Sequence, residues 1–319
     1  MKILYEISEQ LGLGTVVEPP RRLTGGLLHQ MYALSTPRGK YAVKLLNPNI
    51  MARPWAMDCF HRSESLETLL EQTDVPILPA LRFGGGKMQE NGGQFFYVFN
   101  WFDGKALRSD EVDEEHCCII AGHLAQIHGI ARREERFEYE ADEIDWDSYV
   151  RPLSDRNAAL GDLLQRNLDM LYETEDRAYA ACARVPQVAT ICHNDMDCKN
   201  VLWNGRACRI IDLECLDWSN PFIELYETAL YWSGIEQCCV DPHRFEAFIR
   251  AYEDTGGELP NRWTVIHDAN CGRLGWLEYN LKRSLGMDCS AEEISIGKAE
   301  VEKTIAQLAH YHEIRERLN

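Results

Sequence analysis

The stretch that decides the fold runs from residue 191 to residue 214. It reads ICHNDMDCKN over residues 191–200, VLWNG over residues 201–205 and RACRIIDLE over residues 206–214. Asn204-Gly205 separates two apolar runs, and this pair is a strong hairpin signal because both residues tolerate the positive φ of a primed turn. The hairpin would bring Asn200 and Asp212 towards its open end.

An amide oxygen and a carboxylate that converge on one point suit Mg²⁺, a hard cation that binds a few protein oxygens beside water and phosphates. Asp195 lies five residues before Asn200, in a loop that leads into the predicted hairpin. Protein kinases place a catalytic Asp and a metal-binding Asn at this same spacing. The pattern therefore indicates phosphoryl transfer, with Asn200 and Asp212 as metal ligands.

The segment resembles the catalytic motif of aminoglycoside phosphotransferases and choline kinases, His-x-Asp-x-x-x-x-Asn followed by Ile-Asp. The version Asp212-Leu213-Glu214 is more similar to the choline-kinase branch. The resemblance implies a protein-kinase-like fold, Mg²⁺ as cofactor and ATP or GTP as phosphoryl donor. Asp195 would orient the acceptor hydroxyl and take its proton. Three roles stay open for Glu214: binding a second metal, contacting the substrate and capping a helix.

Phosphoryl transfer also needs a cation near the phosphates. Tyr41-Ala42-Val43-Lys44 presents a lysine on a predicted strand, much like the Val-Ala-Ile-Lys of kinases. The Gly25-Gly26 turn precedes it by one strand and resembles the short nucleotide-covering loop of aminoglycoside kinases. We therefore expect Lys44, Gly25 and Gly26 to contact the nucleotide. The chain has no Walker A sequence, which excludes a P-loop enzyme.

Lys44 needs a carboxylate to hold its ammonium group, and the predicted helix that follows offers Glu64, Glu67 and Glu71. Glu64 precedes Val75-Pro76 by the distance usual in the family that the chain resembles. We therefore expect Glu64 to pair with Lys44, with Glu67 as the next candidate.

Residues 96–102, followed by Asp103-Gly104, resemble the interlobe hinge of kinase-like folds. In such folds the main chain of the hinge binds the adenine edge. Asn100, Trp101 and Phe102 would therefore bind the nucleotide mainly through main-chain groups, although their side chains are equally suited to a core.

Hydrophobic patterning divides the chain after residue 102. The first part has helical periodicity over residues 3–12 and 59–72, and strand-like patterns over residues 15–24, 30–35, 40–46, 80–83 and 94–100. The second part is mostly helical around a β-rich island at residues 189–213. We predict an α+β, bilobal fold: a small β-rich nucleotide-binding lobe at residues 1–102 and a larger, mostly helical, catalytic and acceptor-binding lobe at residues 103–319.

Composition limits the partners. The chain of 319 residues has 33 Lys and Arg against 51 Asp and Glu, a net charge of −18, which disfavours nucleic acid and anionic membranes. No apolar run approaches the roughly 18–20 residues of a membrane span, and the N-terminus does not read as a signal peptide, so we expect a cytoplasmic protein. The twelve cysteines form no C-x-x-C pair and read as reduced thiols.

The acceptor is expected to be a small molecule with a hydroxyl group: an aminoglycoside-like antibiotic, an amino alcohol or a sugar. In the enzymes that the chain resembles, the helical lobe supplies the acceptor pocket. Candidates are residues 217–220, 231–232 and 275–280, and one helical face would group Trp276, Tyr279, Asn280 and Arg283. An aromatic stripe is also common in cores. The acidic chain is compatible with a cationic acceptor, and equally with simple solubility.

Two other functions remain as alternatives. A protein kinase is disfavoured because the chain lacks a full glycine-rich loop and an Ala-Pro-Glu segment after Asp212. A non-catalytic nucleotide-binding module of the same fold is disfavoured because Lys44, Asp195, Asn200 and Asp212 occur together.

Overall fold

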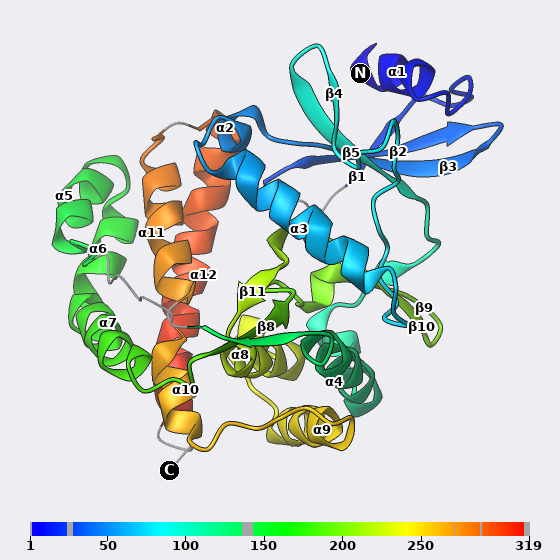
Figure 1. The fold of residues 1–319 in the computed structure, drawn as a ribbon. Helices are drawn as coiled ribbons and strands as arrows, with labels where there is room; N and C mark the ends of the chain where they lie inside the picture. The colour runs from blue at the N-terminus through cyan, green and yellow to red at the C-terminus, as the bar shows by residue number, and fades with distance from the viewer. Residues whose placement is uncertain (1, 24–27, 136–142, 271, 288, 316–319) are drawn as a thin grey trace. The chain divides into compact units, whose positions relative to one another are not determined.

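The computed structural model describes all residues except 1, 24–27, 136–142, 271, 288 and 316–319 (Figure 1). The chain forms two compact units: Met1–Arg108 with His193–Asp217, and Ser109–Cys192 with Trp218–Asn319. This division differs from the predicted single boundary after residue 102. The difference arises because the amide of Ile210 donates to the carbonyl of Pro76 at 2.9 Å, and the amide of Leu78 donates back to Ile210 at 2.8 Å. Residues 193–217 thus pack with the N-terminal residues.

The first unit is built on an antiparallel five-stranded sheet in the order β1-β2-β3-β5-β4. A second sheet has the order β10-β9-β6. The elements are α1 (Lys2–Gln10), β1 (Arg21–Leu23), β2 (Gln30–Thr36), β3 (Gly39–Leu45), α2 (Pro48–Met51), α3 (Ala56–Leu70), β4 (Gln89–Asn91), β5 (Gln94–Asn100), β6 (Lys105–Ala106), η2 (Cys198–Asn200), β9 (Val201–Asn204), β10 (Ala207–Ile210) and η3 (Leu213–Cys215).

The strands β2, β3 and β5 and the helices α1 and α3 confirm the predicted periodicities, but two predicted strands are wrong in extent. Within residues 15–24, the described strand covers only Arg21–Leu23, because Pro19 and Pro20 have no amide hydrogen to donate to a ladder. Residues 80–83 form no regular strand: they pair with β5 through an isolated bridge from Ala80 to Phe99 and a hydrogen bond from the amide of Leu81 to the carbonyl of Val98.

A hydrophobic core lies on one side of the five-stranded sheet. Its buried members come from α1, the loop after it, and the three central strands; they are Leu4, Ile7, Leu13, Leu34, Val43, Leu45, Phe96 and Val98. This packing fixes β3 and β5 against each other. It therefore positions Lys44, near the end of β3, and Asn100, at the end of β5.

The predicted hairpin after Asn200 is confirmed as β9 and β10. Asn204 pairs with Ala207, so the two-residue turn is Gly205-Arg206, and only Gly205 has a positive φ, of 59°. The expected turn at Asn204-Gly205 is therefore wrong by one residue, because Asn204 is the last paired residue of β9. The open end of the hairpin still brings Val201 opposite Ile210.

The second unit is mostly helical. One small sheet has the order β11-β8-β7. The elements are η1 (Ser109–Glu111), α4 (Glu114–His128), β7 (Arg132–Glu134), α5 (Asp147–Arg156), α6 (Ala158–Arg166), α7 (Leu168–Cys182), β8 (Val188–Cys192), β11 (Asp217–Ser219, which begins at the last residue of the first unit), α8 (Pro221–Ser233), η4 (Ile235–Gln237), α9 (Pro242–Asp254), α10 (Trp263–Ala269), α11 (Gly272–Ser284) and α12 (Ala291–Arg315).

Helix pairs make the cores of this unit. Helices α11 and α12 run side by side (Figure 1), and their apolar faces meet those of α6 and α7 around Leu164, Leu277 and Val301. A second core joins α8, α10 and α12 around Tyr226 and Ile266. The β-rich N-terminal part and helical C-terminal part confirm the predicted fold class.

A buried polar network ties α4 to α8, α9 and β8. His128 binds Glu224 through Nε2 and the Tyr252 hydroxyl through Nδ1, each at 2.7 Å, and the Cys192 thiol lies 3.6 Å from Nε2. Both ring nitrogens of His128 are therefore used within the core.

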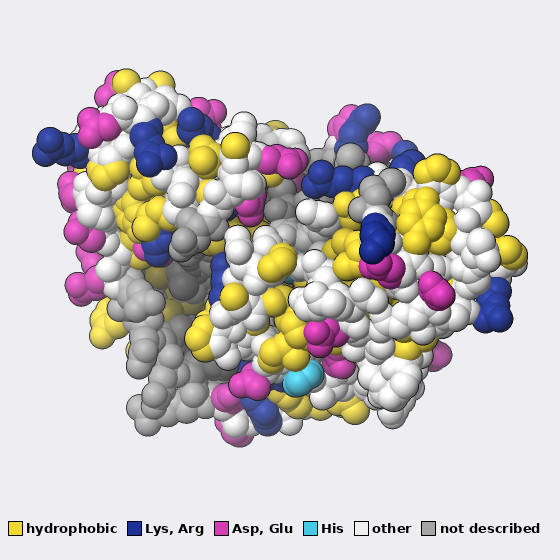
Figure 2. Space-filling model, turned by 90° about the horizontal axis from the view of Figure 1, so that it is seen from above, with side chains coloured by type: hydrophobic (Ala, Val, Ile, Leu, Met, Phe, Trp, Pro, Cys, Tyr) yellow, Lys and Arg dark blue, Asp and Glu magenta, His cyan; other side chains and the backbone are white. Residues whose placement is uncertain are grey.

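Among the described residues, no helix combines the length and the apolar content that crossing a membrane requires. The cysteines in the described ranges are free thiols. Figure 2 shows acidic and basic side chains interspersed on the face that it views.

Candidate active site

The loop between β8 and β9 is held by side-chain hydrogen bonds to its own main chain. The Nδ2 group of Asn200 donates to the main-chain oxygen and to the Oδ2 atom of Asp195, both at 2.8 Å. His193 lies 3.1 Å through Nε2 from the carbonyl of Ile211 and 3.3 Å through Nδ1 from the amide of Asp195. Because a carbonyl only accepts, Nε2 carries the proton and Nδ1 accepts from Asp195. His193 therefore fixes the loop.

The Asp195 carboxylate is half-buried and faces charged neighbours. Burial raises its pKa and the nearby Asp212 acts in the same direction, while Lys199 opposes them. The ammonium group of Lys199 lies 3.4 Å from Oδ1 of Asp195 and also binds Asp197. A carboxylate whose pKa is raised towards the working pH is a better general base than an ordinary aspartate.

Asn200 and Asp212 are brought together by the main chain. The amide of Ile211 donates to the carbonyl of Asn200 at 2.9 Å. Asp212 is the next residue after Ile211, so this hydrogen bond brings the two predicted metal ligands together. Asp212 itself has φ 63° and ψ 51°. This left-handed conformation costs a non-glycine residue about 1–2 kcal/mol and is a frequent feature of functional sites.

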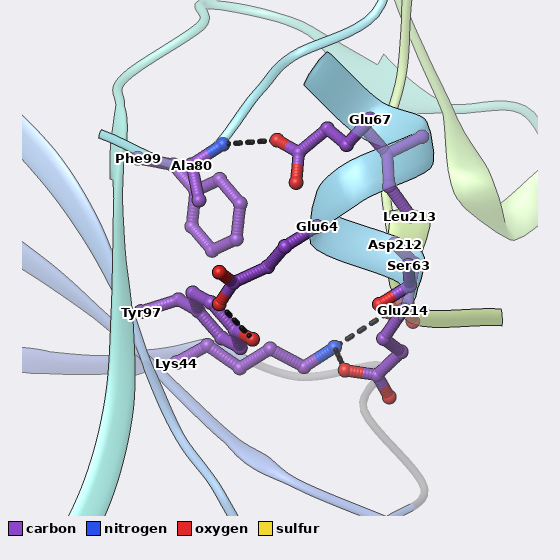
Figure 3. A pocket seen from close by; sticks show the side chains of 10 residues that line it. All are labelled: Lys44, Ser63, Glu64, Glu67, Ala80, Tyr97, Phe99, Asp212, Leu213 and Glu214. Carbon is purple, nitrogen blue, oxygen red and sulfur yellow. Dashed lines mark hydrogen bonds and ion pairs between the residues drawn. The ribbon is translucent and has the colours of Figure 1, made fainter. Parts of the chain in front are cut away.

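Lys44 binds the segment that follows the hairpin (Figure 3). Its ammonium group lies 2.5 Å from Oδ1 of Asp212 and also binds Glu214. Glu214 in turn accepts from Nε2 of His29 at 3.0 Å, and Nδ1 of His29 accepts from the amide of Asn47. The lysine of β3 is thus fixed to η3 by two carboxylates.

These buried charges stabilise one another. Burial acts to raise the pKa of Glu214, but Lys44 and His29 overcome it and lower this pKa to about 2. Burial alone would lower the pKa of Lys44, but Asp212 and Glu214 raise it. Both shifts favour the charged forms, an ammonium group on Lys44 and a carboxylate on Glu214.

The expected pairing of Lys44 with Glu64 does not occur in this structure. Glu64 points from α3 towards Tyr97, whose hydroxyl donates to it at 2.9 Å, and it also accepts from the amide of Met88 (Figure 3). Glu67, the second candidate, binds Lys87 and the amide of Ala80. Glu64 and Glu67 thus accept from other donors. The carboxylates that bind Lys44 belong to Asp212 and Glu214, which are distant from it in the sequence.

The predicted hinge residues lie at the end of β5. The amide of Trp101 donates to the carbonyl of Lys40 at 3.1 Å, so this main-chain donor is used by the sheet. Along an antiparallel ladder, hydrogen-bonded residue pairs alternate with pairs that exchange no main-chain hydrogen bond. Asn100 and Tyr41 form the pair next to Trp101 and Lys40, so the main-chain N–H and C=O groups of Asn100 point away from Tyr41. The Lys40 ammonium lies 3.6 Å from the Trp101 ring centroid, and Arg209 stacks on Phe102. Gly25 and Gly26 lie outside the described residues.

The predicted metal ligands fit a hard cation. The two groups that Nδ2 of Asn200 contacts are both acceptors, so the amide nitrogen must face them and the Oδ1 atom points the other way. Asp212 adds a carboxylate that already holds a cation, the ammonium group of Lys44. Oxygen ligands of this kind suit Mg²⁺.

Residues 20–262 match the sequence model of the phosphotransferase enzyme family, APH, over more than half of the chain. The chain belongs to the phosphotransferase enzyme family. Membership makes it a small-molecule kinase. No curated protein sequence matches it.

Solved structures show that this family member shares its fold with small-molecule kinases. A spectinomycin phosphotransferase in complex with ADP and spectinomycin aligns with TM-score 0.72 and 14% identity, over 97% of each chain. An amicoumacin kinase in complex with AMP-PNP and Ca²⁺ aligns with TM-score 0.64 and 11% identity, over 94% of this chain and 92% of that one. An ethanolamine kinase of Plasmodium vivax aligns with TM-score 0.61 and 14% identity, over 94% and 83%.

Sequence reasoning named Glu214 but did not pair it with Lys44, and it missed His29. Glu214 binds Lys44, and His29 orients Glu214. The position of Glu214, two residues after Asp212, was a signal that it lay near the site. His29 had no comparable signal, because its contact with Glu214 depends on the tertiary structure.

Proposed function

We propose that the protein transfers the γ-phosphoryl group of ATP or GTP to a hydroxyl group of a small molecule. The observation that carries the proposal is the contact between Asn200 and Asp195, with Lys44 bound to Asp212 in the same unit. A base, two metal ligands and a phosphate-binding cation are the parts that phosphoryl transfer requires.

In this mechanism Asp195 accepts the proton of the acceptor hydroxyl as the oxygen attacks phosphorus. Asn200 holds the carboxylate through Oδ2, which leaves Oδ1 for the hydroxyl once Lys199 yields that position. Lys44 binds the phosphates and is held in place by Glu214. Asn200 and Asp212 would hold Mg²⁺, which neutralises charge on the phosphates.

The acceptor is proposed to be an aminoglycoside-like antibiotic, an amino alcohol or a sugar. Structures of the same fold include kinases named for spectinomycin, amicoumacin and ethanolamine, and two of them were solved with adenine nucleotides. We propose a cytoplasmic protein, and the net charge of −18 supports one that binds neither nucleic acid nor anionic membranes. Residues 1–102 are proposed to bind the nucleotide, and residues 103–319 to provide the catalytic and acceptor-binding groups.

The test is ADP or GDP release with Mg²⁺ across a panel of alcohols: aminoglycosides, macrolides, amino alcohols and sugars. We expect release that depends on one acceptor class and is lost in Asp195→Asn. Nucleotide binding without release for any acceptor would contradict the proposal and favour a regulatory nucleotide-binding module.

A further inference from the structure

A second lysine, Lys199, lies in the same loop as the proposed base. Its ammonium group is 3.4 Å from Oδ1 of Asp195 and also binds Oδ2 of Asp197. The side chain of Lys199 is 46% exposed and that of Asp195 is 32% exposed, so both groups are open to solvent. All three residues belong to the first unit, which also contains Lys44 and Asn200.

Asp197 attaches Lys199 to the loop at two points. The Oδ1 atom of Asp197 accepts from the main-chain amide of Lys199 at 2.9 Å, and the Oδ2 atom binds its ammonium group. Asp197 is only 3% exposed, and a buried carboxylate is costly unless a cation pairs with it. Lys199 therefore stays in the loop when its second, more exposed contact with Asp195 is released.

That second contact lies where the acceptor must bind. Nδ2 of Asn200 holds Oδ2 of Asp195 at 2.8 Å, so Oδ1 is the atom that receives the acceptor hydroxyl. In a reactive arrangement the hydroxyl oxygen is about 3–3.5 Å from the γ-phosphorus. Because Lys199 lies beside the same Oδ1 atom on a flexible four-carbon side chain, its ammonium group can reach the oxygens of the γ-phosphoryl group.

The charges at the site call for a cation at this place. Transfer brings the negative γ-phosphoryl group close to the Asp195 carboxylate, and like charges repel strongly when they are partly removed from water. Lys44 is 6% exposed and its charge is shared by Asp212 and Glu214. Lys199, in contrast, already contacts the carboxylate that the phosphoryl group approaches.

We propose that Lys199 is a catalytic residue that binds the transferring γ-phosphoryl group, an inference that rests on the proposed function. The acceptor oxygen forms a bond to the γ-phosphorus while the bond from phosphorus to the β–γ bridging oxygen breaks, and that electron pair leaves with ADP or GDP. The hydroxyl proton passes to Oδ1 of Asp195. Lys199 keeps its protons and moves one hydrogen bond from Oδ1 to a phosphoryl oxygen, where it stabilises the transition state.

The first test is Lys199→Met, assayed by ADP or GDP release with the best alcohol of the acceptor panel. We expect kcat to fall by about 10- to 100-fold, the range for a hydrogen bond to a charged group. The KM for nucleotide should stay within about 3-fold, because the contact forms mainly in the transition state. If Lys199 only obstructed Oδ1, its removal would instead lower the KM of the acceptor and leave kcat unchanged.

Matched variants separate catalysis from support of the loop. Lys199→Arg keeps a cation and should retain kcat within about 5-fold. Lys199→Met leaves the buried Asp197 without its ammonium partner, so the double variant Asp197→Asn with Lys199→Met removes that unpaired charge. The double variant should stay as impaired as Lys199→Met and serves as the test if the single variant does not fold. Lys2→Met, which removes an exposed lysine of the same unit, should leave kcat unchanged.

Binding of ADP with Mg²⁺ and aluminium fluoride, measured by calorimetry, needs no acceptor. Aluminium fluoride takes the place of the transferring phosphoryl group, so it should tighten ADP binding to the wild type by about 10-fold or more. Lys199→Met should abolish this gain, and Lys199→Arg should keep most of it.

These outcomes distinguish the inference from the proposed function. If no alcohol is phosphorylated but the gain depends on Lys199, the inference stands and only the proposed function falls. If an alcohol is phosphorylated and Lys199→Met keeps kcat within about 3-fold, or the double variant regains kcat, only the inference falls. A wild type that shows neither turnover nor the gain contradicts both.

Discussion

The side-chain amide of Asn200 donates two hydrogen bonds of 2.8 Å to Asp195, one to its main-chain oxygen and one to its carboxylate. The proposed metal ligand and the proposed base are therefore held in one rigid geometry before any substrate binds. Such preorganisation is what a transfer reaction needs, because the enzyme then spends little energy on arranging its own groups.

The base is tested by Asp195→Asn, which keeps the size of the side chain and removes its ability to take a proton. We expect kcat to fall by about 100- to 10,000-fold, the usual contribution of a general base. Nucleotide affinity should stay within a few-fold of the wild type, because Lys44 and Asp212 are intact. ADP or GDP release and equilibrium nucleotide binding measure the two effects. A variant that keeps a tenth of the activity would rule out Asp195 as the base.

The metal site is tested by Asp212→Ala. We expect the affinity for nucleotide in the presence of Mg²⁺ to fall by at least about 10-fold, since one of two protein ligands is lost. The affinity without Mg²⁺ should change less. Nucleotide titrations at several Mg²⁺ concentrations measure this, with Asp74→Ala, an exposed acid of the same unit, as control. An equal loss with and without Mg²⁺ would indicate that Asp212 acts only through Lys44.

The partner of Lys44 is tested by comparing Lys44→Met with Glu64→Gln. Lys44→Met should weaken nucleotide binding by about 10- to 100-fold, because a charged contact to phosphate is lost. Glu64→Gln keeps an oxygen that can accept from Tyr97 and Met88, so its effect should stay below about 3-fold. If nucleotide titrations show both variants equally impaired, then Glu64 forms the ion pair with Lys44 in the working enzyme, as the sequence predicted.

Stability should depend on pH through His267, which is buried in the helical unit. Burial lowers its pKa to about 3, from 6.5 in an unfolded chain, and Tyr226 binds its Nδ1 atom. Below pH 6.5 the unfolded chain therefore binds more protons than the folded protein. The free energy of unfolding should fall as the pH falls from about 6.5 to about 3, by up to about 1.4 kcal/mol per pH unit from this group.

Chemical denaturation of the wild type and of His267→Gln at pH 7.5, 6.5, 5.5 and 4.5 measures this dependence. Because carboxylates also contribute to acid lability, the quantity to follow is the difference between the two proteins. Parallel curves would exclude His267 as the cause.

The contact between α11 and α12 is tested by Gly297→Ala. A Cβ atom there would lie 2.8 Å from Cβ of Arg283 and 2.9 Å from the amide nitrogen of Ser284. We expect a loss of about 1–3 kcal/mol in the free energy of unfolding, from overpacking. Gly275→Ala, on α11 where nothing lies within 4 Å, should instead stabilise by about 0.5–1 kcal/mol through helix propensity. Denaturation curves that show the same sign for both would contradict this packing.

Local sequence patterns predicted the features that depend only on residues close to one another in the chain. The five-residue spacing from Asp195 to Asn200 predicted their juxtaposition, which a single loop and the short helix η2 produce. Asn204-Gly205 predicted the hairpin but misplaced its turn by one residue, because pairing extends to Asn204. The helix α3 followed from the periodicity over residues 59–72 and agrees with the structure.

The sequence by itself determined the family, the catalytic loop and the strand that carries Lys44, since each is encoded by neighbouring residues. Only the tertiary structure decided which carboxylates hold Lys44. Asp212 and Glu214 are 168 and 170 residues away from it, and Glu64, although nearer in sequence, is bound by Tyr97.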